Sequence, residues 1–401
     1  MGERTATEAV GSGFELRSEE GWRDPFPMYR DLRDHDPVHH VERGDYWVLS
    51  RYRDVFATAR DTDTFSSAQG LTHLYGEIES AGLDAARPMV FLDPPEHTEF
   101  RRLVAKGFTP RHVAEIEPAV RSFAVERIDA LRERGGGDIV AELLKPLPTF
   151  VVAHYLGVPE SDRARFDGWV HRVVAASATG DALDASDTVA EIYEYFSALI
   201  EQRRREPGDD TISHLVRAGD GAGVDPMRIL GFAFTMITGG NDTTTGLLSV
   251  GLDLLHRAPE QQAALAADPD LAEDAVEELL RLTSPVQGLA RTTTVDVEID
   301  GVTIPAGRKV LLLYASANRD PREFGDDADA VRIDRRPRQI LTFGYGAHHC
   351  LGAAAARLMG RVVLEELVTR CPRYAVDGDA ATFAPGNFVR WYSTLPFVPH
   401  A

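Results

Sequence analysis

The chain has 401 residues, of which 43% are hydrophobic and 26% are charged, and its formal net charge is −20. These are ordinary values for a globular protein, and the length allows a large hydrophobic core. The acidity argues against nucleic acid as a partner, because phosphate binding requires a basic surface. Only Cys350 and Cys371 are present. The fold therefore does not depend on disulfides, and a reducing cytoplasm fits the composition.

The N-terminal part combines a polar tail with short elements. Residues 1–20 are mixed in charge and lack an apolar run, so we expect a loose tail with neither a signal peptide nor a membrane anchor. A helix is predicted at 25–34 and a strand at 46–50, which is rich in aromatic and β-branched residues. Residues 65–95 contain scattered glycines, and a loop of this length usually has a function.

A charged helix is predicted to begin after Asp93, which we expect to act as its N-cap. Prolines follow in the first turn, acids come early and bases late. His97 and Arg101 are four positions apart and therefore lie on one face. From Arg101 to Arg111 there are basic residues and no acid, which indicates a docking patch. A solvated charged helix is the alternative.

Helical periodicity predicts amphipathic core helices at 113–134, 139–156, 162–176 and 187–205. The stretch 176–182 between the last two is rich in small residues, and composition alone predicts a loop there.

The longest helix is predicted at 226–258, and Asp242 is the only charge in its central part. The segment 239–245 (Gly-Gly-Asn-Asp-Thr-Thr-Thr) is too polar for a membrane span. Adjacent glycines and threonine hydroxyls that bond back to carbonyls loosen a helical ladder, so we expect a core helix that is weakened and locally opened there. A buried Asp242 beside Thr243 would be a proton-relay arrangement.

A further helix at 272–282 carries Glu278 and Arg281, which are spaced to form a salt bridge. Such a pair is frequent by chance. Pro285 ends this helix. Residues 297–313 then have strand character, with a hairpin turn at Asp300-Gly301 and a second turn at 305–307.

Residues 343–352 (Phe-Gly-Tyr-Gly-Ala-His-His-Cys-Leu-Gly) hold the densest cluster of reactive residue types. Helix formers follow from Ala353, so Cys350 is expected near a helix N-terminus, where backbone N–H groups lower a thiol pKa. Gly344 and Gly346 allow φ > 0 in the preceding loop. The expected product is a preformed, half-buried thiolate. A structural cysteine or a His-His-Cys zinc site is the alternative, although three adjacent residues cannot easily converge on one ion.

The pattern Phe-Gly-x-Gly-x-His-x-Cys-x-Gly resembles the haem-ligand loop of cytochromes P450. Residues 239–244 resemble the oxygen-binding motif of that family, and Glu278-x-x-Arg281 its structural acid–base pair. The resemblance covers about 25–399. It implies a mainly α fold with a small β-rich subdomain, shaped as a triangular prism around a buried haem. Residues 21–401 would be one catalytic domain, whose β-rich side is built from about 38–52, 286–314 and 384–398.

The resemblance also implies a role for each matching residue. Cys350 would be the thiolate ligand of the iron of haem b, Thr243 would hydrogen-bond the bound oxygen, and Asp242 would help to deliver protons. Arg335, or alternatively Arg336, would complete the Glu278–Arg281 pair; His349 receives no role. The remaining contacts divide into propionate partners (His97, Arg101, Arg291, His348), other haem contacts (Phe343, Gly344, Gly352, Gly240) and substrate contacts (Val286, Leu289, Gly239, Thr235, Phe388, Val389).

The expected function is that of a haem-thiolate monooxygenase, which inserts one atom of O₂ into a lipophilic small molecule by hydroxylation, epoxidation or dealkylation. The resemblance places the substrate pocket between 66–92, 170–186, 230–240, 286–290 and 387–389, with 176–182 as a mobile lid. A peroxide-dependent peroxygenase and a non-catalytic haem-binding or ligand-sensing protein are the alternatives.

No Gly-x-Gly-x-x-Gly fingerprint for a flavin or nicotinamide opens a helix, so electrons must come from an external ferredoxin and ferredoxin reductase. We expect a cytoplasmic monomer. The predicted basic face for the ferredoxin consists of Arg102, Lys106, Arg111, Arg357 and Arg361.

Overall fold

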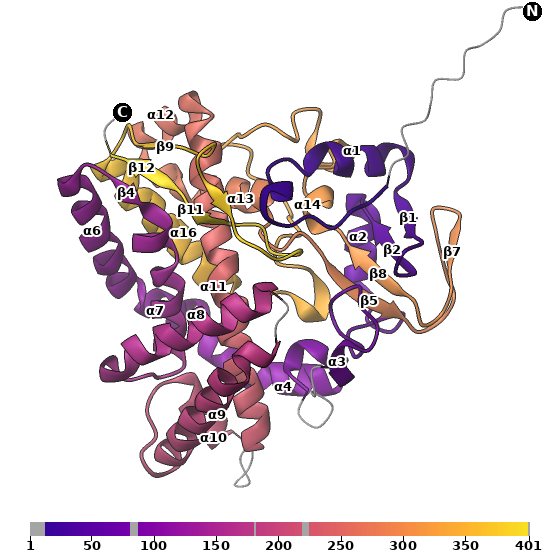
Figure 1. Ribbon diagram of the computed structural model, residues 1–401, viewed down its shortest axis with the longest axis horizontal. Coiled ribbons are helices and arrows are strands. Elements are labelled where there is room, and N and C mark those ends of the chain that lie inside the picture. Colours follow the sequence, from indigo (N-terminus) through magenta and orange to yellow (C-terminus); the bar gives the residue numbers. More distant parts are fainter. Residues whose placement is uncertain (1–12, 81–86, 180–181, 219–223, 400–401) are drawn as a thin grey trace, which may run out of the picture.

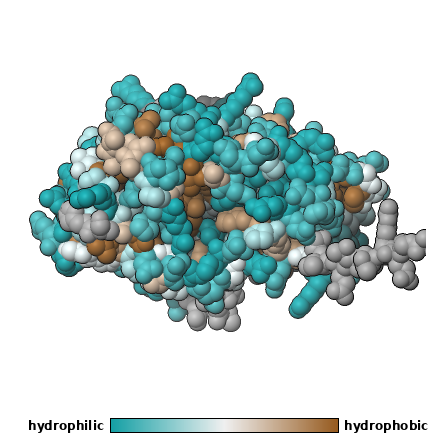
Figure 2. Space-filling view, turned by 90° about the horizontal axis from the view of Figure 1, so that it is seen from above, coloured by the Kyte–Doolittle hydropathy of each residue, from teal (hydrophilic) through white to brown (hydrophobic). Residues whose placement is uncertain are grey.

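The computed structural model describes residues 13–80, 87–179, 182–218 and 224–399. Helices form most of the molecule, and strands lie in a five-stranded main sheet and in smaller sheets of two or three strands (Figure 1). The predicted mainly α fold with small sheets is therefore confirmed. The face shown in Figure 2 is mostly hydrophilic, with a hydrophobic band near its middle and smaller hydrophobic patches toward its sides. Among the described residues, no helix has the length and apolar character needed to span a bilayer.

The predicted helices are present in the predicted order, and most of their boundaries agree within a few residues. The helices at 52–60, 77–80, 211–217, 259–267, 314–317 and 321–324 were not predicted. The described helices are α1 (Phe26–His35), α2 (Tyr52–Arg60), α3 (Glu77–Ser80), α4 (Glu96–Val104), α5 (Pro110–Glu115), α6 (Glu117–Arg134), α7 (Pro146–Tyr155), α8 (Arg163–Thr179), α9 (Ala182–Arg205), α10 (Thr211–Arg217), α11 (Pro226–His256), α12 (Pro259–Ala267), α13 (Ala272–Thr283), α14 (Tyr314–Ala317), α15 (Pro321–Phe324) and α16 (Ala353–Arg370). The predicted helix at 139–156 is divided into a π-helix, η4 (Val140–Leu144), and α7.

The main sheet has the strand order β1-β2-β8-β5-β3, in which only β2 and β8 run parallel. Its strands are β1 (Val38–Val41), β2 (Tyr46–Leu49), β3 (Phe65–Ser66), β5 (Leu289–Thr293) and β8 (Lys309–Leu312). The predicted hairpin forms from β6 (Val297–Ile299) and β7 (Val302–Ile304). Asp300 and Gly301 turn it with φ of 50° and 80°, the left-handed region that such tight turns require.

The C-terminal strands do not join this sheet. β12 (Pro396–Val398) pairs with β4 (Gly137–Asp138) and β9 (Ala375–Val376), and β11 (Tyr392–Thr394) pairs with β10 (Thr382–Phe383). One isolated bridge, between Val286 and Val389, connects the two regions. Strand character can be predicted locally, but the pairing partner is decided by contacts distant in sequence.

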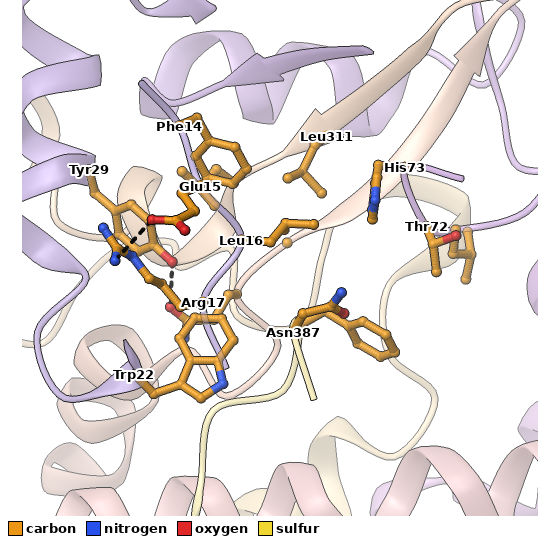
Figure 3. Close-up of a pocket in the computed structure, with 15 residues that line it drawn as sticks. Phe14, Glu15, Leu16, Arg17, Trp22, Tyr29, Thr72, His73, Leu311 and Asn387 are labelled. Atoms are coloured by element: carbon orange, nitrogen blue, oxygen red, sulfur yellow. Dashed lines mark hydrogen bonds and ion pairs between the residues drawn. The ribbon is translucent and has the colours of Figure 1, made fainter. Parts of the chain in front are cut away.

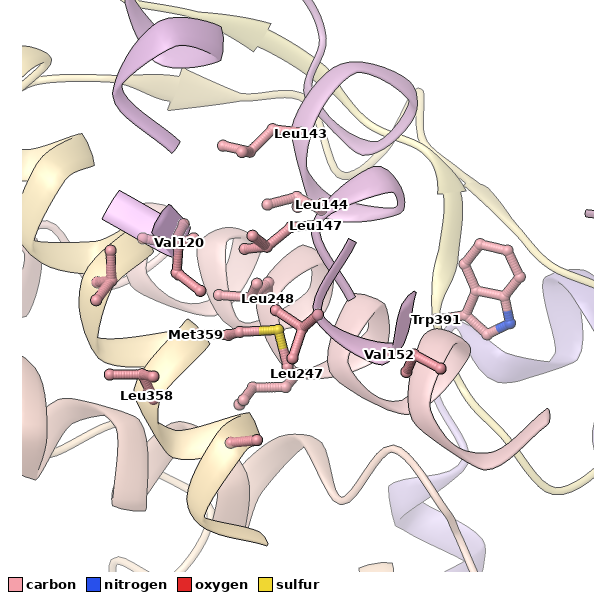
Figure 4. Packing of buried hydrophobic residues seen from close by; sticks show 14 of the residues in the cluster. Val120, Leu143, Leu144, Leu147, Val152, Leu247, Leu248, Leu358, Met359 and Trp391 are labelled. Carbon is pink, nitrogen blue, oxygen red and sulfur yellow. The ribbon is translucent and has the colours of Figure 1, made fainter. Parts of the chain in front are cut away.

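Helix α11 runs through the largest hydrophobic cluster, as predicted. Its Leu247 and Leu248 lie among Leu144, Leu147 and Met359 (Figure 4). The expected local opening is wrong, because α11 is helical without interruption from Pro226 to His256. Back-bonding to carbonyls four residues earlier does occur, from Thr238, Asn241, Thr243 and Thr245. Packing on both sides keeps the ladder intact despite these extra donors to its carbonyls.

Two further expectations fail for reasons of tertiary contact. Asp93 does not cap α4, whose N-cap is Pro95; its carboxylate instead accepts hydrogen bonds from Ser66 Oγ (2.5 Å) and Ser67 N (2.8 Å). The N-terminal segment is not loose up to residue 20, because Phe14 and Trp22 are buried; residues 1–12 lie outside the described part.

The loop predicted at 176–182, which was expected to form a lid, is shorter than predicted. α8 continues to Thr179 and α9 begins at Ala182, and residues 180–181 lie outside the described part.

Glu278 and Arg281 form a fully buried pair beneath the loop that leads to Cys350. Arg281 Nε and Nη2 each donate to one carboxylate oxygen at 2.8 Å, and both side chains are 0% exposed. Arg335 Nε adds a third bond of 3.0 Å to Glu278, whereas Arg336 bonds Asp274 at the surface. Arg281 also donates to the carbonyls of Asn318 and Ala328, and these bonds link α13 to the segment that leads to the Cys350 loop.

We predict that Glu278→Gln lowers the free energy of unfolding by about 3 kcal/mol or more, since Arg281 would keep a buried, uncompensated charge. Asp274→Asn removes the carboxylate of an exposed pair and should cost less than about 1 kcal/mol. Urea unfolding of both variants measures the difference. Equal losses would contradict a structural role for the buried pair.

Candidate functional site

The loop 343–352 presents Cys350 three residues before α16, whose N-cap is Gly352. Gly344 and Gly346 adopt φ of 64° and 70°, as the sequence predicted. A Cβ on Gly346 would lie 2.8 Å from the carbonyl oxygen of Ala59, so the loop packs tightly on α2. Cys350 N donates to Phe343 O at 2.9 Å, which closes the loop.

The cysteine side chain is solvent-accessible, but the surrounding protein restricts its hydration. Desolvation raises the pKa of the Cys350 thiol, and the Gly352 N–H, Arg101 and Arg357 oppose this only partly. The predicted lowering of the pKa is therefore wrong for the protein alone. The helix-terminal donors exist, but loss of hydration outweighs them. Ionisation of this thiol requires a strong cationic partner at the sulfur.

Four basic side chains from three parts of the chain gather beside this loop. The rings of His97 and His348 lie 4.2 Å apart, and Arg101 and Arg291 act electrostatically on both. Burial, followed by the neighbouring cations, lowers the pKa of His348 to about 3. His97 is 1% exposed, and its Nδ1 has no hydrogen-bond partner among the described residues. This cluster is suited to a ligand with carboxylates.

Sequence reasoning missed two contacts that orient this cluster. Ser67 Oγ lies 3.2 Å from His348 Nε2, and Arg101 donates to the backbone carbonyl of His349. In this bond His349 takes part through its backbone carbonyl and not through its ring. No pattern in the sequence points to Ser67, which comes next to the cluster only because Asp93 holds its backbone N–H.

On α11, Gly239 and Thr243 lie four residues apart and share a face. A Cβ on Gly239 would meet nothing within 4 Å, whereas one on Gly240 would meet Val152 at 2.9 Å. Gly239 therefore lines open space and Gly240 allows α7 to pack closely. Thr243 Oγ1 donates to the Gly239 carbonyl at 2.9 Å. Thr235, on the same helix, makes the equivalent bond to Gly231.

Asp242 is a half-buried acid with an unusual environment. Its Oδ1 is buried and has no partner among the described residues. Burial raises the pKa of Asp242 to about 6, and the charge of Lys145 opposes the rise. Lys145 was missed in the sequence, where its position within an apolar stretch (139–156) was the available signal. A carboxyl group with a pKa near neutral can both release and accept protons under ordinary conditions.

The predicted substrate contacts are only partly brought together. Phe388 lines a pocket with Gln287 and Gly288 (Figure 3), and Val286 and Val389 form the bridge beside it. Leu289 is half-buried in β5. The same pocket is lined by Phe14, Leu16, Arg17 and Trp22 from the N-terminal segment, which sequence reasoning treated as a tail. Of the expected wall 66–92, residues 81–86 lie outside the described part.

Comparison with known proteins decides the family. A family model described as Cytochrome P450 matches residues 10–373. The chain belongs to the cytochrome P450 family. It is 58% identical over 400 residues to Cytochrome P450 130 of Mycobacterium tuberculosis, covering 98% of this chain and 99% of that protein. It is 35% identical to the Vitamin D(3) 25-hydroxylase of Pseudonocardia autotrophica, covering 94% of each.

The fold of this P450 also matches solved structures. CYP109E1 from Bacillus megaterium, solved in complex with testosterone, superposes with a TM-score of 0.84 at 31% identity, covering 94% of this chain and 99% of that one. The P450 is thus an oxidoreductase that incorporates oxygen into its substrate, and its cofactor is haem b.

The residues present fit that cofactor. An accessible cysteine sulfur, the unpaired Nδ1 of His97 and the cluster of Arg101, Arg291 and His348 are the donors that an iron porphyrin with two propionates requires. The part of the chain that the structure describes contains no group of three or more His, Cys, Asp or Glu side chains that could hold a metal ion.

We predict that Gly346→Ala destabilises the protein more than Gly344→Ala. Both substitutions place a Cβ at positive φ, at a cost of about 1–2 kcal/mol. At Gly346 the new Cβ would also meet the Ala59 carbonyl at 2.8 Å, whereas at Gly344 the nearest atoms lie 3.8 Å away. Thermal unfolding of the two holoproteins measures the difference, and equal losses would show that contact with α2 does not fix the loop.

Proposed function

We propose that this P450 is a monooxygenase that hydroxylates, epoxidises or dealkylates a lipophilic small molecule with electrons from an external ferredoxin and its reductase. The observation that carries the proposal is the proximity on α11 of Thr243 and Asp242, a half-buried acid with a near-neutral pKa whose buried Oδ1 has no partner among the described residues. A protein that only stores haem or senses a ligand needs no such acid. A peroxygenase does not need protons delivered to oxygen either.

In this proposal Cys350 binds the haem iron through its sulfur, and the thiolate donates electron density that favours cleavage of the O–O bond when haem is bound. Phe343, Gly344 and Gly352 shape the loop around that sulfur. His97, Arg101, Arg291 and His348 hold the propionates. The buried triad of Glu278, Arg281 and Arg335 supports the loop and has no chemical role.

Above the cofactor, Thr243 and Asp242 handle protons. With haem bound, the Thr243 hydroxyl, which donates to the Gly239 carbonyl in this structure, would be available to hydrogen-bond the oxygen, and Asp242 would supply protons and regain them from water. Gly239 and Gly240 allow the oxygen and α7, respectively, to approach α11. Because burial keeps Asp242 largely unhydrated, its proton transfers follow a defined route rather than bulk exchange.

The pocket chemistry supports a lipophilic substrate. The cavity of Figure 3 is lined mainly by apolar groups, among them Phe14, Leu71, Leu311 and Phe388. Val286 and Val389, which form the bridge beside this cavity, and Leu289 and Thr235 are also proposed to contact the substrate. The relative named for vitamin D(3) and the neighbour solved with testosterone are consistent with a large apolar molecule.

Fewer of the basic residues predicted from the sequence remain candidates for docking the electron donor. Arg357 contacts Glu277, Arg361 binds Glu117 (2.6 Å) and Glu365 (2.9 Å), and Arg111 lies 3.4 Å from Glu115. Their charges are therefore largely compensated. Arg102, in α4, and Lys106, in η3 (Ala105–Phe108), are exposed and have no acid partner within 4 Å among the described residues. We propose these two as the docking charges on a monomer in the cytoplasm.

We predict that Thr243→Ala lowers the product formed per O₂ consumed by on the order of 10²-fold, because delivery of protons contributes a factor of this size. Thr238→Ala is the matched control, since Thr238 makes the same type of back-bond, to the Phe234 carbonyl, and lies five residues before Thr243. Oxygen electrode and product assays with reduced ferredoxin measure the ratio. Unchanged coupling in Thr243→Ala would exclude the relay and favour the non-catalytic alternative.

We predict that Arg102→Glu with Lys106→Glu slows reduction by an acidic ferredoxin about tenfold or more at low salt, and that added salt reduces the difference. Arg43→Glu, an exposed residue between β1 and β2, is the control. Stopped-flow reduction in the presence of carbon monoxide measures the rate. Equal rates for the double variant and the control would reject this docking site.

A further inference from the structure

Lys145 is a cation in an apolar part of the fold to which no role has been assigned. It stands between η4 and α7, directly after buried Leu144 and two residues before buried Leu147. Its surroundings restrict hydration, and burial lowers the pKa of its ammonium group. A lysine at such a position loses hydration and must be compensated by a specific contact.

The backbone around Lys145 is fixed against the centre of α11. Thr245 Oγ1 donates to the carbonyl of Leu144 at 3.2 Å, and Thr149 Oγ1 donates to Asn241 Oδ1 at 2.8 Å. α7 approaches so closely that a Cβ on Gly240 would meet Val152 at 2.9 Å (Figure 4). The junction of η4 and α7 therefore lies directly beside residues 240–245.

The position of the Lys145 ammonium group is fixed by its contact with Trp391. Lys145 Nζ lies 5.3 Å from the centroid of the Trp391 ring, a cation–π distance. Trp391 also packs on α11, because a Cβ on Gly246 would lie 3.3 Å from Trp391 Cβ. Gly246 is four residues after Asp242 and shares its helix face. Lys145 is thus held between the indole and the face of α11 that carries Asp242.

No other cation competes for this place. Arg390, next to Trp391, is directed away, since its Nε donates to the Trp22 carbonyl at 2.6 Å and its guanidinium lies over Phe26 and Phe383. Lys145 is the one charge that acts on Asp242 within the described structure. No nitrogen of a described Lys, Arg or His lies within 4 Å of that carboxylate, so the two groups are coupled without forming a closed ion pair.

We propose that Lys145 is a positioning residue for proton delivery, whose ammonium charge keeps the Asp242 carboxyl able to ionise inside an apolar site. Without this charge, burial would leave a larger share of the acid protonated at neutral pH, so that fewer Asp242 carboxylates could take up a proton. Lys145 keeps its own proton throughout, and the protons that Asp242 releases are replaced from water. The proposal rests on the relay role of Asp242 proposed above.

The test measures the pKa of Asp242 directly in the ferric holoenzyme. The carboxyl band in infrared difference spectra is assigned by its loss in Asp242→Asn and followed against pH in Lys145→Met, Lys145→Gln and Lys145→Arg. Removing a nearby positive charge raises a carboxyl pKa, so we expect an increase of about one unit in Lys145→Met and Lys145→Gln. Lys145→Arg should stay close to the wild type, as should Lys309→Met, which removes a buried lysine bound to the Gln69 carbonyl.

The same variants are then assayed for product formed per O₂ across pH. We expect the acid limb of the profile to move to higher pH in Lys145→Met by the same amount as the infrared pKa. An unchanged infrared pKa in both neutral variants would overturn the role of Lys145. A shifted pKa with an unchanged profile would instead overturn the relay role of Asp242, so the two failures are distinguishable.

Discussion

The structure depends on one constraint, which is that a single cysteine sulfur must be accessible at a fixed place in a tightly packed interior. Two glycines at positive φ turn the loop, and the contact of Gly346 with Ala59 permits no side chain there. The buried triad of Glu278, Arg281 and Arg335 anchors the chain that leads into this loop. Most of the surrounding helices position these few atoms and contribute no chemistry of their own.

Loss of hydration serves different chemical purposes at Cys350 and at Asp242. It raises the pKa of both Cys350 and Asp242. At Cys350 the effect reserves the thiolate for a strong cation such as the haem iron, because the protein alone does not stabilise the anion. At Asp242 it brings the pKa into the range where protons are exchanged. The cluster of His97, Arg101, Arg291 and His348 compensates carboxylates for lost hydration, because its positive charge is in place before they bind.

Local patterns in the sequence were sufficient for much of this account. The cysteine loop, α11, the hairpin at Asp300-Gly301 and the Glu278–Arg281 spacing depend on neighbours within a few residues, so they could be predicted. The capping of α4 could not, because Ser66 and Ser67 compete for Asp93 from 26 or more positions away. The same limit applies to the partners of the C-terminal strands, the burial of Phe14 and the acids that neutralise Arg357 and Arg361. The role of Lys145 could not be predicted, because it depends on Trp391 and Asp242, which only the fold brings near Lys145.

The central claim is that the sulfur of Cys350 binds the haem iron as a thiolate. The most direct measurement is the absorption spectrum of the reduced holoprotein with carbon monoxide, compared between the wild type and Cys350→Ser. The account predicts a strongly red-shifted Soret band in the wild type and its loss in the variant, with Cys371→Ser unchanged. A wild-type spectrum without that band, or the same band in Cys350→Ser, would contradict it.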